Sequence, residues 1–314
     1  MFTHMATADL ITLTWGGQIP IMFVLAAADV AQLHPPAPRY VMGSRMAYLP
    51  RLAEEAIASF RLAVAPSGGG SQNVWFEASG VPLKWQLPMG VLVDAVRGYQ
   101  PPSPLPFQVV VHFHDFPSDK VLACAGMESA RRSYINNLKQ SACLRFGSAK
   151  RVLTGLSEIQ QQQMWEAIAT GNHLQFSACN ETLHGLKCEG KVERRSVRLV
   201  AAVDSVKKEG GDIRLRSVLR PLVEREEGEE EELDKDAGDG GGGGGGGDSG
   251  TTVVANVTLA SFLKTSNVDE SEGTITVHGV PMPLDADLVE LHELMSSADN
   301  CLYVVLSGSF VQLL

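Results

Sequence analysis

Apolar and polar residues alternate in several short stretches near the start of the chain, and apolar residues follow helical spacing in others. A Ser79-Gly80 pair separates two of the alternating runs, which predicts a hairpin. Pro88 suits the first turn of a helix. The expected strands and hairpin lie at 18–26, 39–49, 74–85 and 106–116, and the expected helices at 51–64 and 88–96.

The same order of elements returns near the end of the chain. The expected strands and hairpin there lie at 196–205, 212–221, 274–284 and 300–310, and the expected helices at 257–266 and 288–295. Both hairpins carry Gly-Val-Pro, beginning at Gly80 and at Gly279. Two strands, a helix, a hairpin, a helix and a strand follow one another in the ubiquitin-like (β-grasp) fold, so the sequence predicts two related domains of this kind.

The intervening stretch is expected to be helical. An apolar stripe at helical spacing predicts one helix that ends at Gly147. The stripe consists of Met127, Ala130, Tyr134, Leu138 and Ala142. Ser157 is expected to cap a second helix at 157–170. The side chains expected to pack from that helix are Ile159, Met164, Trp165 and Ile168.

These patterns together predict the α+β class, with two ubiquitin-like domains flanking a helix-rich domain. The expected domains are 1–120, 121–190 and 191–314. An acidic, Gly-rich insertion at about 224–250 interrupts the last domain and is expected to be disordered. Its eleven acidic and two basic residues supply nine of the ten net negative charges. The remainder is nearly neutral, so no nucleic-acid partner is expected.

Five scattered cysteines without a CxxC pair predict free thiols in a reducing compartment. The first residues lack the basic and apolar segments of a signal peptide. The longest apolar stretch, 19–28, is much shorter than the roughly 20 residues of a membrane span. A cytoplasmic protein is therefore expected.

The usual motifs for nucleotide binding, nucleophilic catalysis and paired-carboxylate catalysis do not occur in the sequence, so neither a catalytic centre nor a cofactor is expected. A zinc hydrolase remains an alternative, although the spacing of its candidate ligands matches no standard zinc site. Those candidates are His173, Cys179, His184 and Cys188. His112 and His114 are expected on the solvent side of a strand, and Cys143 is expected to be a buried thiol.

One lysine and one tryptophan stand out. Lys139 lies about 120° round its predicted helix from the centre of the apolar stripe, beside the packed surface but open to solvent. Trp75 and Trp85 are expected in the core. Trp15 precedes the first expected strand, which leaves both a core position and a partner-binding position open.

Motifs along nearly the whole chain resemble the autophagy protein 5 family. The stretch 74–96 is similar to the family's WFE…TPL-x-W-x-YPxGLLFD pattern, with Leu87 in place of Tyr and Val93 in place of Phe. The matching positions are Trp75, Phe76, Glu77, Pro82, Leu83, Trp85, Pro88, Gly90, Leu92 and Asp94. Further similar stretches are 14–20 (the W-x-G-x-IP opening), 138–150 (the central lysine helix) and 275–306 (the C-terminal domain).

The resemblance implies a function that the residues alone do not. In this family the central lysine, here Lys139, forms an isopeptide bond with autophagy protein 12, a reaction carried out by an activating and a conjugating enzyme. The conjugate then binds an N-terminal helix of autophagy protein 16, a contact for which Trp15 is the candidate here. The assembly promotes the lipidation of autophagy protein 8, so it acts like a ligase without a catalytic centre of its own.

The resemblance also implies peripheral recruitment to the preautophagosomal membrane. A basic cluster is the candidate lipid contact, and it consists of Lys191, Arg194, Arg195 and Arg198. Besides the conjugation scaffold and the zinc hydrolase, an unconjugated ubiquitin-like adaptor that binds an amphipathic partner helix remains an alternative.

Overall fold

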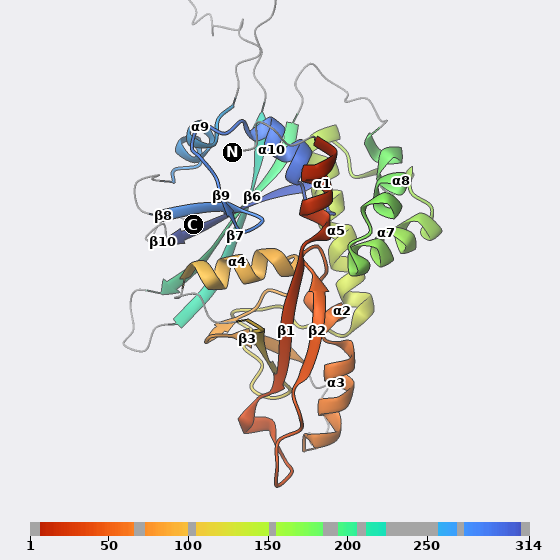
Figure 1. Cartoon of the computed structure of the whole chain (residues 1–314), viewed down its shortest axis with the longest axis vertical. Helices are drawn as coiled ribbons and strands as arrows, with labels where there is room; N and C mark the ends of the chain where they lie inside the picture. Colours follow the sequence, from red (N-terminus) through yellow and green to blue (C-terminus); the bar gives the residue numbers. More distant parts are fainter. Residues whose placement is uncertain are drawn as a thin grey trace, which may run out of the picture.

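The computed structural model describes residues 7–65, 73–99, 105–150, 155–184, 194–205, 212–223, 257–268 and 273–308. The expected insertion at 224–250 lies outside these residues. Two five-stranded mixed sheets and a group of helices make up the described part of the molecule (Figure 1). Among its helices none is both long and apolar enough to cross a membrane.

The first ubiquitin-like domain is built on a sheet in which β1 pairs antiparallel with β2 and parallel with β5. The strand order is β2-β1-β5-β3-β4. Its strands are β1 (Gln18–Leu25), β2 (Arg39–Ser44), β3 (Trp75–Ala78), β4 (Val81–Pro82) and β5 (Phe107–His112). Its helices are α1 (Thr7–Gly16), η1 (Ala27–Asp29), α2 (Leu49–Leu52), α3 (Glu54–Phe60), η2 (Arg61–Ala63) and α4 (Met89–Tyr99).

The second ubiquitin-like domain repeats this topology, with the strand order β7-β6-β10-β8-β9. Its strands are β6 (Arg194–Ser205), β7 (Asp212–Val223), β8 (Gly273–Val277), β9 (Val280–Pro281) and β10 (Cys301–Gly308). Its helices are α9 (Leu259–Thr265) and α10 (Leu288–Met295). The helices described in the helical domain between the two are α5 (Met127–Phe146), α7 (Glu158–Thr170) and α8 (His173–His184). The predicted α+β class and two ubiquitin-like domains are thus confirmed.

The two Gly-Val-Pro hairpins have matching turns. Both central residues have positive φ, at Ser79 (51°) and Gly80 (79°) in one and at His278 (50°) and Gly279 (77°) in the other. Such turns suit the right-handed twist of the flanking strands and favour Gly at a central position. The shared tripeptide therefore marks the same turn in both domains.

Helix α4 is buried on nearly all sides. Its sequence is apolar around most of its circumference, and Asp94 is its one acidic residue. In Figure 1 it crosses between the two sheets, and it packs against β6 and β10 of the second domain. Such a mostly apolar helix is expected in a core position.

The central strands of the second sheet are buried on both faces. One face packs on α9 and α10, through residues that include Val197, Leu199, Leu302 and Val304. The other joins the core that contains α4 and α5, through Val200, Ala202, Tyr303 and Val305. This second face links the two ubiquitin-like domains in one continuous core.

The approach of α4 to β10 depends on Gly98. A Cβ placed there would overlap the Ser307 hydroxyl and would lie 2.6 Å from the Ser307 Cβ. The backbones can pack this closely only because Gly98 has no side chain.

Gly98→Ala is expected to lower the free energy of unfolding by about 1–3 kcal/mol, because the added methyl forces β10 away from α4. Ala favours a helix over Gly by about 1 kcal/mol, which acts in the opposite direction. A net loss of stability would therefore come from the steric overlap with β10. Denaturant unfolding measures the change. Gly16→Ala is the control, since a Cβ at Gly16 meets nothing within 4 Å. Equal stability of the two variants would contradict the close packing.

An ion pair lies under the second hairpin at the same domain boundary. Arg45, which follows β2, donates to Asp94 of α4, whose side chain is 8% exposed. Burial raises the pKa of Asp94, and the charge of Arg45 opposes this rise. A Cβ at Gly279 would lie 2.9 Å from Asp94 Oδ1 and 3.4 Å from Arg45 Nη2, so the hairpin rests directly on the pair.

His278 lies in the same contact. Its Nε2 is 2.9 Å from the Met295 carbonyl oxygen, to which it donates when the ring is neutral. Burial and then the charge of Arg45 lower the pKa of His278 to about 4, and the bond to Met295 opposes them. The imidazole is therefore neutral in the folded protein near neutral pH.

Between about pH 6.5 and the folded pKa, the unfolded chain binds a proton at His278 that the folded chain does not, so stability falls as pH is lowered. His278→Asn, which tolerates positive φ, is expected to remove up to about 3 kcal/mol of this pH dependence. Urea unfolding of both proteins at about pH 7 and about pH 4.5 measures it. Asp94 and Asp299 have raised pKa values, so their contribution to stability changes with pH in the opposite direction. This contribution is present in both proteins. An unchanged pH dependence in the variant would show that His278 is not the proton-binding group.

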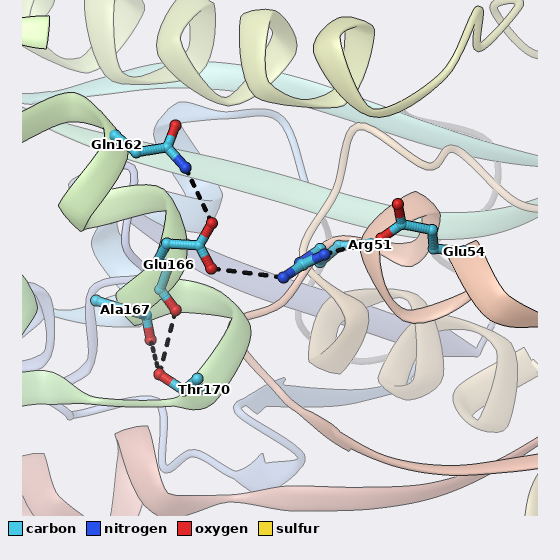
Figure 2. A network of polar contacts seen from close by, with 6 residues as sticks. All are labelled: Arg51, Glu54, Gln162, Glu166, Ala167 and Thr170. Carbon is cyan, nitrogen blue, oxygen red and sulfur yellow. Dashed lines mark hydrogen bonds and ion pairs between the residues drawn. The ribbon is translucent and has the colours of Figure 1, made fainter. Parts of the chain in front are cut away.

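A polar network connects the first domain to the helical domain, as Figure 2 shows. Arg51 of α2 donates to Glu54 (2.8 Å) and to Glu166 of α7 (3.4 Å). Gln162 donates to the other carboxylate oxygen of Glu166 (2.9 Å). These side chains are partly exposed, so the network orients α7 more than it stabilises the fold.

Some predicted details are wrong. Helix α1 was not expected, 51–64 is divided into α2, α3 and η2, and the second strand ends at Ser44. Ile159 was expected to pack but is 72% exposed, because it lies about 180° round α7 from the buried Ile168. Cys143 was expected to be buried but is exposed, since it lies about 140° round α5 from Leu138.

Other details are confirmed. Met164, Trp165 and Ile168 are buried, as are Ala130, Tyr134, Leu138 and Ala142 of the expected stripe, whereas Met127 is only partly buried. Ser157 caps α7 and Gly147 ends α5. Trp75 and Trp85 are core residues whose indole N–H groups donate to the carbonyls of His114 (2.8 Å) and Leu122 (2.7 Å).

Candidate functional site

Lys139 lies half-buried on the flank of α5 that faces α7. This matches the position expected from the helical spacing. Within the part of the chain that the structure describes, its ammonium group has no hydrogen bond and no ion pair. A lysine held next to packed surface without a carboxylate partner is accessible to an incoming reactant.

A hollow of about 510 Å³ opens beside Lys139, between α5 and α7. Its lining is mostly polar, with Ile135 as its apolar residue; the other lining residues are Glu128, Arg131, Arg132, Asn136, Lys139, Glu158 and Gln161. Glu128 pairs with Arg132 at 3.2 Å, so that carboxylate is engaged away from Lys139. The hollow leaves room for a reactant next to the amine.

The opposite face of α5 is fixed to all three domains through Tyr134. The Tyr134 hydroxyl donates to the Ala298 carbonyl of the second ubiquitin-like domain at 3.1 Å. The ring lies 5.9 Å from those of Tyr48 in the first domain and Trp165 in the helical domain. Burial raises the pKa of Tyr134 well above its usual range, so the hydroxyl remains a hydrogen-bond donor.

Two further contacts fix the flank of α5 that faces away from α7. Asn137 donates to the Gln86 carbonyl at 3.1 Å, and Arg198 of β6 donates to Gln140 at 2.9 Å. Lys139 therefore projects from a helix whose position is set by both ubiquitin-like domains. Cys143, one turn further along α5, is a free and exposed thiol.

Trp15 lines a second cavity, of about 380 Å³, where α1, α8 and α10 meet. Its ring packs at 4.5 Å from Phe176 and 5.3 Å from His173. Trp15 is 5% exposed, so the partial exposure considered from the sequence is not seen in the isolated chain. The cavity borders the helical domain and the second ubiquitin-like domain.

The floor of this cavity contains contacts that the sequence did not indicate. Asn180 of α8 and Asn300, before β10, exchange side-chain hydrogen bonds of 3.0 and 2.9 Å. Asn300 has φ 56°, a conformation that Asn tolerates better than most residues. Also in the lining, the buried Arg195 of β6 donates to Glu293 of α10 at 3.0 Å. Both polar pairs thus line the cavity.

The zinc alternative gains no support. His173 packs on Trp15, whereas Cys179 is buried on the other side of α8, where its thiol donates to Gln163 at 3.6 Å. Cys188 and the His184 side chain lie outside the described residues. In the described ranges no group of three or more His, Cys, Asp and Glu is placed to hold a metal ion.

His112 lies on the less buried face of β5, as expected, whereas His114 lies beyond the end of that strand and is partly buried. His112 stacks on Trp75 at 3.8 Å, and His114 bonds Asp29 at 2.9 Å, so both have structural contacts. The basic cluster is dispersed. Arg195 is buried against Glu293, Arg198 contacts α5, and Lys191 lies outside the described residues.

Comparisons with known proteins give a consistent picture. Three family models match the chain, described as the UblA domain (residues 14–113), the alpha-helical bundle region (127–185) and the UblB domain (202–306) of autophagy protein ATG5. A crystal structure of Kluyveromyces marxianus Atg5 has the same fold, with a TM-score of 0.67 and 19% sequence identity. The match covers 96% of this chain and 100% of that one.

Curated relatives named autophagy protein 5 align with part of the chain. Those of Oryza sativa subsp. japonica and Arabidopsis thaliana are 37% and 31% identical over 158 residues, and that of Penicillium rubens is 31% identical over 183 residues. The alignments cover 50%, 50% and 54% of this chain and 40%, 45% and 57% of the relatives. The chain thus spans about half the length of the curated relatives it matches.

Proposed function

The chain belongs to the autophagy protein ATG5 family, which implies a role in autophagy, and we propose that it acts there as the scaffold of a ubiquitin-like conjugation system. The observation that carries this proposal is Lys139: an accessible amine without a partner among the described residues, on a helix fixed to all three domains. An acceptor lysine has to meet a thioester on another protein, and a fixed helix gives it a constant position.

The proposed reaction joins Lys139 to the C-terminal glycine of autophagy protein 12. The neutral Lys139 amine attacks the thioester carbonyl that links autophagy protein 12 to its conjugating enzyme. The C–S bond breaks, the cysteine thiolate leaves, and the amine loses a proton as the isopeptide bond forms. An activating enzyme supplies the thioester beforehand, so this chain needs no catalytic centre and no cofactor of its own.

The cavity at Trp15 is the proposed docking site for the N-terminal helix of autophagy protein 16. An amphipathic helix presents apolar side chains at intervals of three and four residues, which fit the apolar part of this cavity, and its polar side chains meet the polar lining. Trp15 and Phe176 belong to the apolar part, and Arg195 and Glu293 belong to the polar lining. The partner would reach the aromatic pair by displacing α1 or by entering beside it.

In this proposal the conjugate recruits the enzyme that attaches autophagy protein 8 to phosphatidylethanolamine. The protein is cytoplasmic and is recruited peripherally to the preautophagosomal membrane. The alternative is an adaptor that binds the partner helix through the same cavity but is never conjugated. A covalent adduct distinguishes the two.

Lys139→Arg is expected to abolish conjugation, because the guanidinium stays protonated and cannot attack a thioester. The assay combines the chain with autophagy protein 12, its two enzymes and ATP, and maps the adduct by mass spectrometry. Lys150→Arg is the matched control, since Lys150 is an exposed lysine near the end of the same region. An adduct on Lys150 of the wild-type chain would argue against Lys139 as the acceptor. So would the absence of any adduct on wild type when the enzymes are active on a control substrate.

Trp15→Ala is expected to weaken binding of the partner helix at least about tenfold, because it removes the largest apolar surface of the cavity. Isothermal titration with the autophagy protein 16 helix measures the affinity, and circular dichroism checks folding. Trp15→Phe keeps an aromatic contact with Phe176 and is expected to lose less affinity for the helix than Trp15→Ala. A folded Trp15→Ala protein with unchanged affinity would place the helix elsewhere.

A further inference from the structure

The lower end of the molecule in Figure 1 is formed by the β1–β2 connection and the end of α3. Two leucines at this end of the first ubiquitin-like domain are almost fully exposed. Leu33 is 93% exposed in the β1–β2 connection, and Leu62 is 83% exposed in η2. Two such leucines on one protruding end are unusual for a surface that stays in water.

Backbone contacts hold the two leucines on adjacent segments. The Ala31 amide donates to the Ala63 carbonyl at 2.9 Å, and the Gln32 side chain donates to the Leu62 carbonyl at 3.2 Å. A bridge between Val30 and Val64 continues this pairing toward the core. The exposed leucines thus belong to an ordered surface.

The side chains around the leucines are basic or amphipathic. Arg39 and Arg61 are exposed, Arg39 donates to Ser59 at 2.8 Å, and Tyr40 is 67% exposed at the start of β2. His34 is exposed beside Leu33. We call these six residues the leucine tip; they are Leu33, His34, Arg39, Tyr40, Arg61 and Leu62.

Acidic side chains are scarce at the leucine tip. None occurs between residues 30 and 53. Asp29 is buried and accepts bonds from the Phe113 amide (2.6 Å) and from His114 (2.9 Å). Glu54 and Glu55 begin α3, at the end of that helix away from Leu62. Asp115 is an exposed carboxylate at this end of the sheet, because it follows His114, which contacts Asp29.

We propose that the leucine tip is a docking surface for a bilayer that contains anionic lipid. Leu33 and Leu62 enter the boundary between headgroups and acyl chains, Tyr40 lies at the level of the headgroups, and Arg39 and Arg61 meet the lipid phosphates. A bilayer is a better fit than a protein groove because the apolar residues protrude and the charged members of the leucine tip, Arg39 and Arg61, are both basic. This proposal names the surface behind the membrane recruitment in the proposed function, and it rests on that function only for the identity of the membrane.

The test is flotation of the full chain with vesicles of phosphatidylcholine alone and with about 30% phosphatidylserine. Wild type is expected to float with the anionic vesicles, less so at high salt. The double variant Leu33→Ser/Leu62→Ser is expected to lose about tenfold in partitioning. Arg39→Gln/Arg61→Gln is expected to lose the preference for anionic vesicles and the salt dependence.

The matched control is Ile159→Ser/Leu174→Ser. These residues are 72% and 81% exposed on α7 and α8, so the control removes similar apolar area from another surface. It is expected to float like wild type. The proposal would be overturned if both double variants lost flotation equally, if Leu33→Ser/Leu62→Ser lost none, or if wild type did not float.

Two further readouts separate this proposal from others. A dimer in light scattering that disappears in Leu33→Ser/Leu62→Ser would show that the leucine tip binds a second copy instead of lipid, and would overturn the proposal. The same variant is expected to be conjugated on Lys139 like wild type. Failure of flotation with intact conjugation rejects the leucine tip alone, whereas failure of conjugation in wild type rejects the proposed function.

Discussion

The burial of α4 between the two sheets is the interaction on which the rest of the structure depends. In a separate ubiquitin-like domain, the sheet face opposite the helices meets water. Here that face of the second domain packs on a helix of the first domain and on α5, in one continuous core. Apolar burial is the main stabilising contribution to a fold, so neither domain can leave the other without exposing this core. Gly98 and the Arg45–Asp94 pair under the hairpin are the close contacts that this arrangement requires.

The position of Lys139 follows from this packing. Because α5 lies against β6 and bonds to both ubiquitin-like domains, its solvent-facing flank has one fixed orientation relative to the whole molecule. A conjugated protein would therefore be presented in a constant place relative to the Trp15 cavity and the leucine tip. The proposed scaffold role needs that constancy, since a scaffold acts by positioning other proteins.

Local patterns were sufficient for most of the fold. Alternation and helical spacing located every strand and hairpin of both sheets, and α10 lies at the expected 288–295. Helix α1 was missed because three of its ten residues are the β-branched Thr, which favours a helix only weakly. Ile11 and Trp15, four residues apart, are the signal, and both line the cavity beneath it. Lys139 was placed correctly because flank positions follow from the stripe. The Asn180–Asn300 and Arg195–Glu293 pairs join residues that are distant in the sequence, so no local pattern indicates them.

Native-state hydrogen exchange tests most directly whether the two ubiquitin-like domains and α5 form one cooperative unit. The amides of α4, β1 and β10 would be followed under conditions in which exchange reports opening free energies. The account predicts that all three open with the same free energy, equal to that of global unfolding, because α4 cannot be exposed while either sheet stays intact. Exchange of α4 and β1 at a markedly lower free energy than β10 would contradict it, since the first domain would then open while the second stays folded.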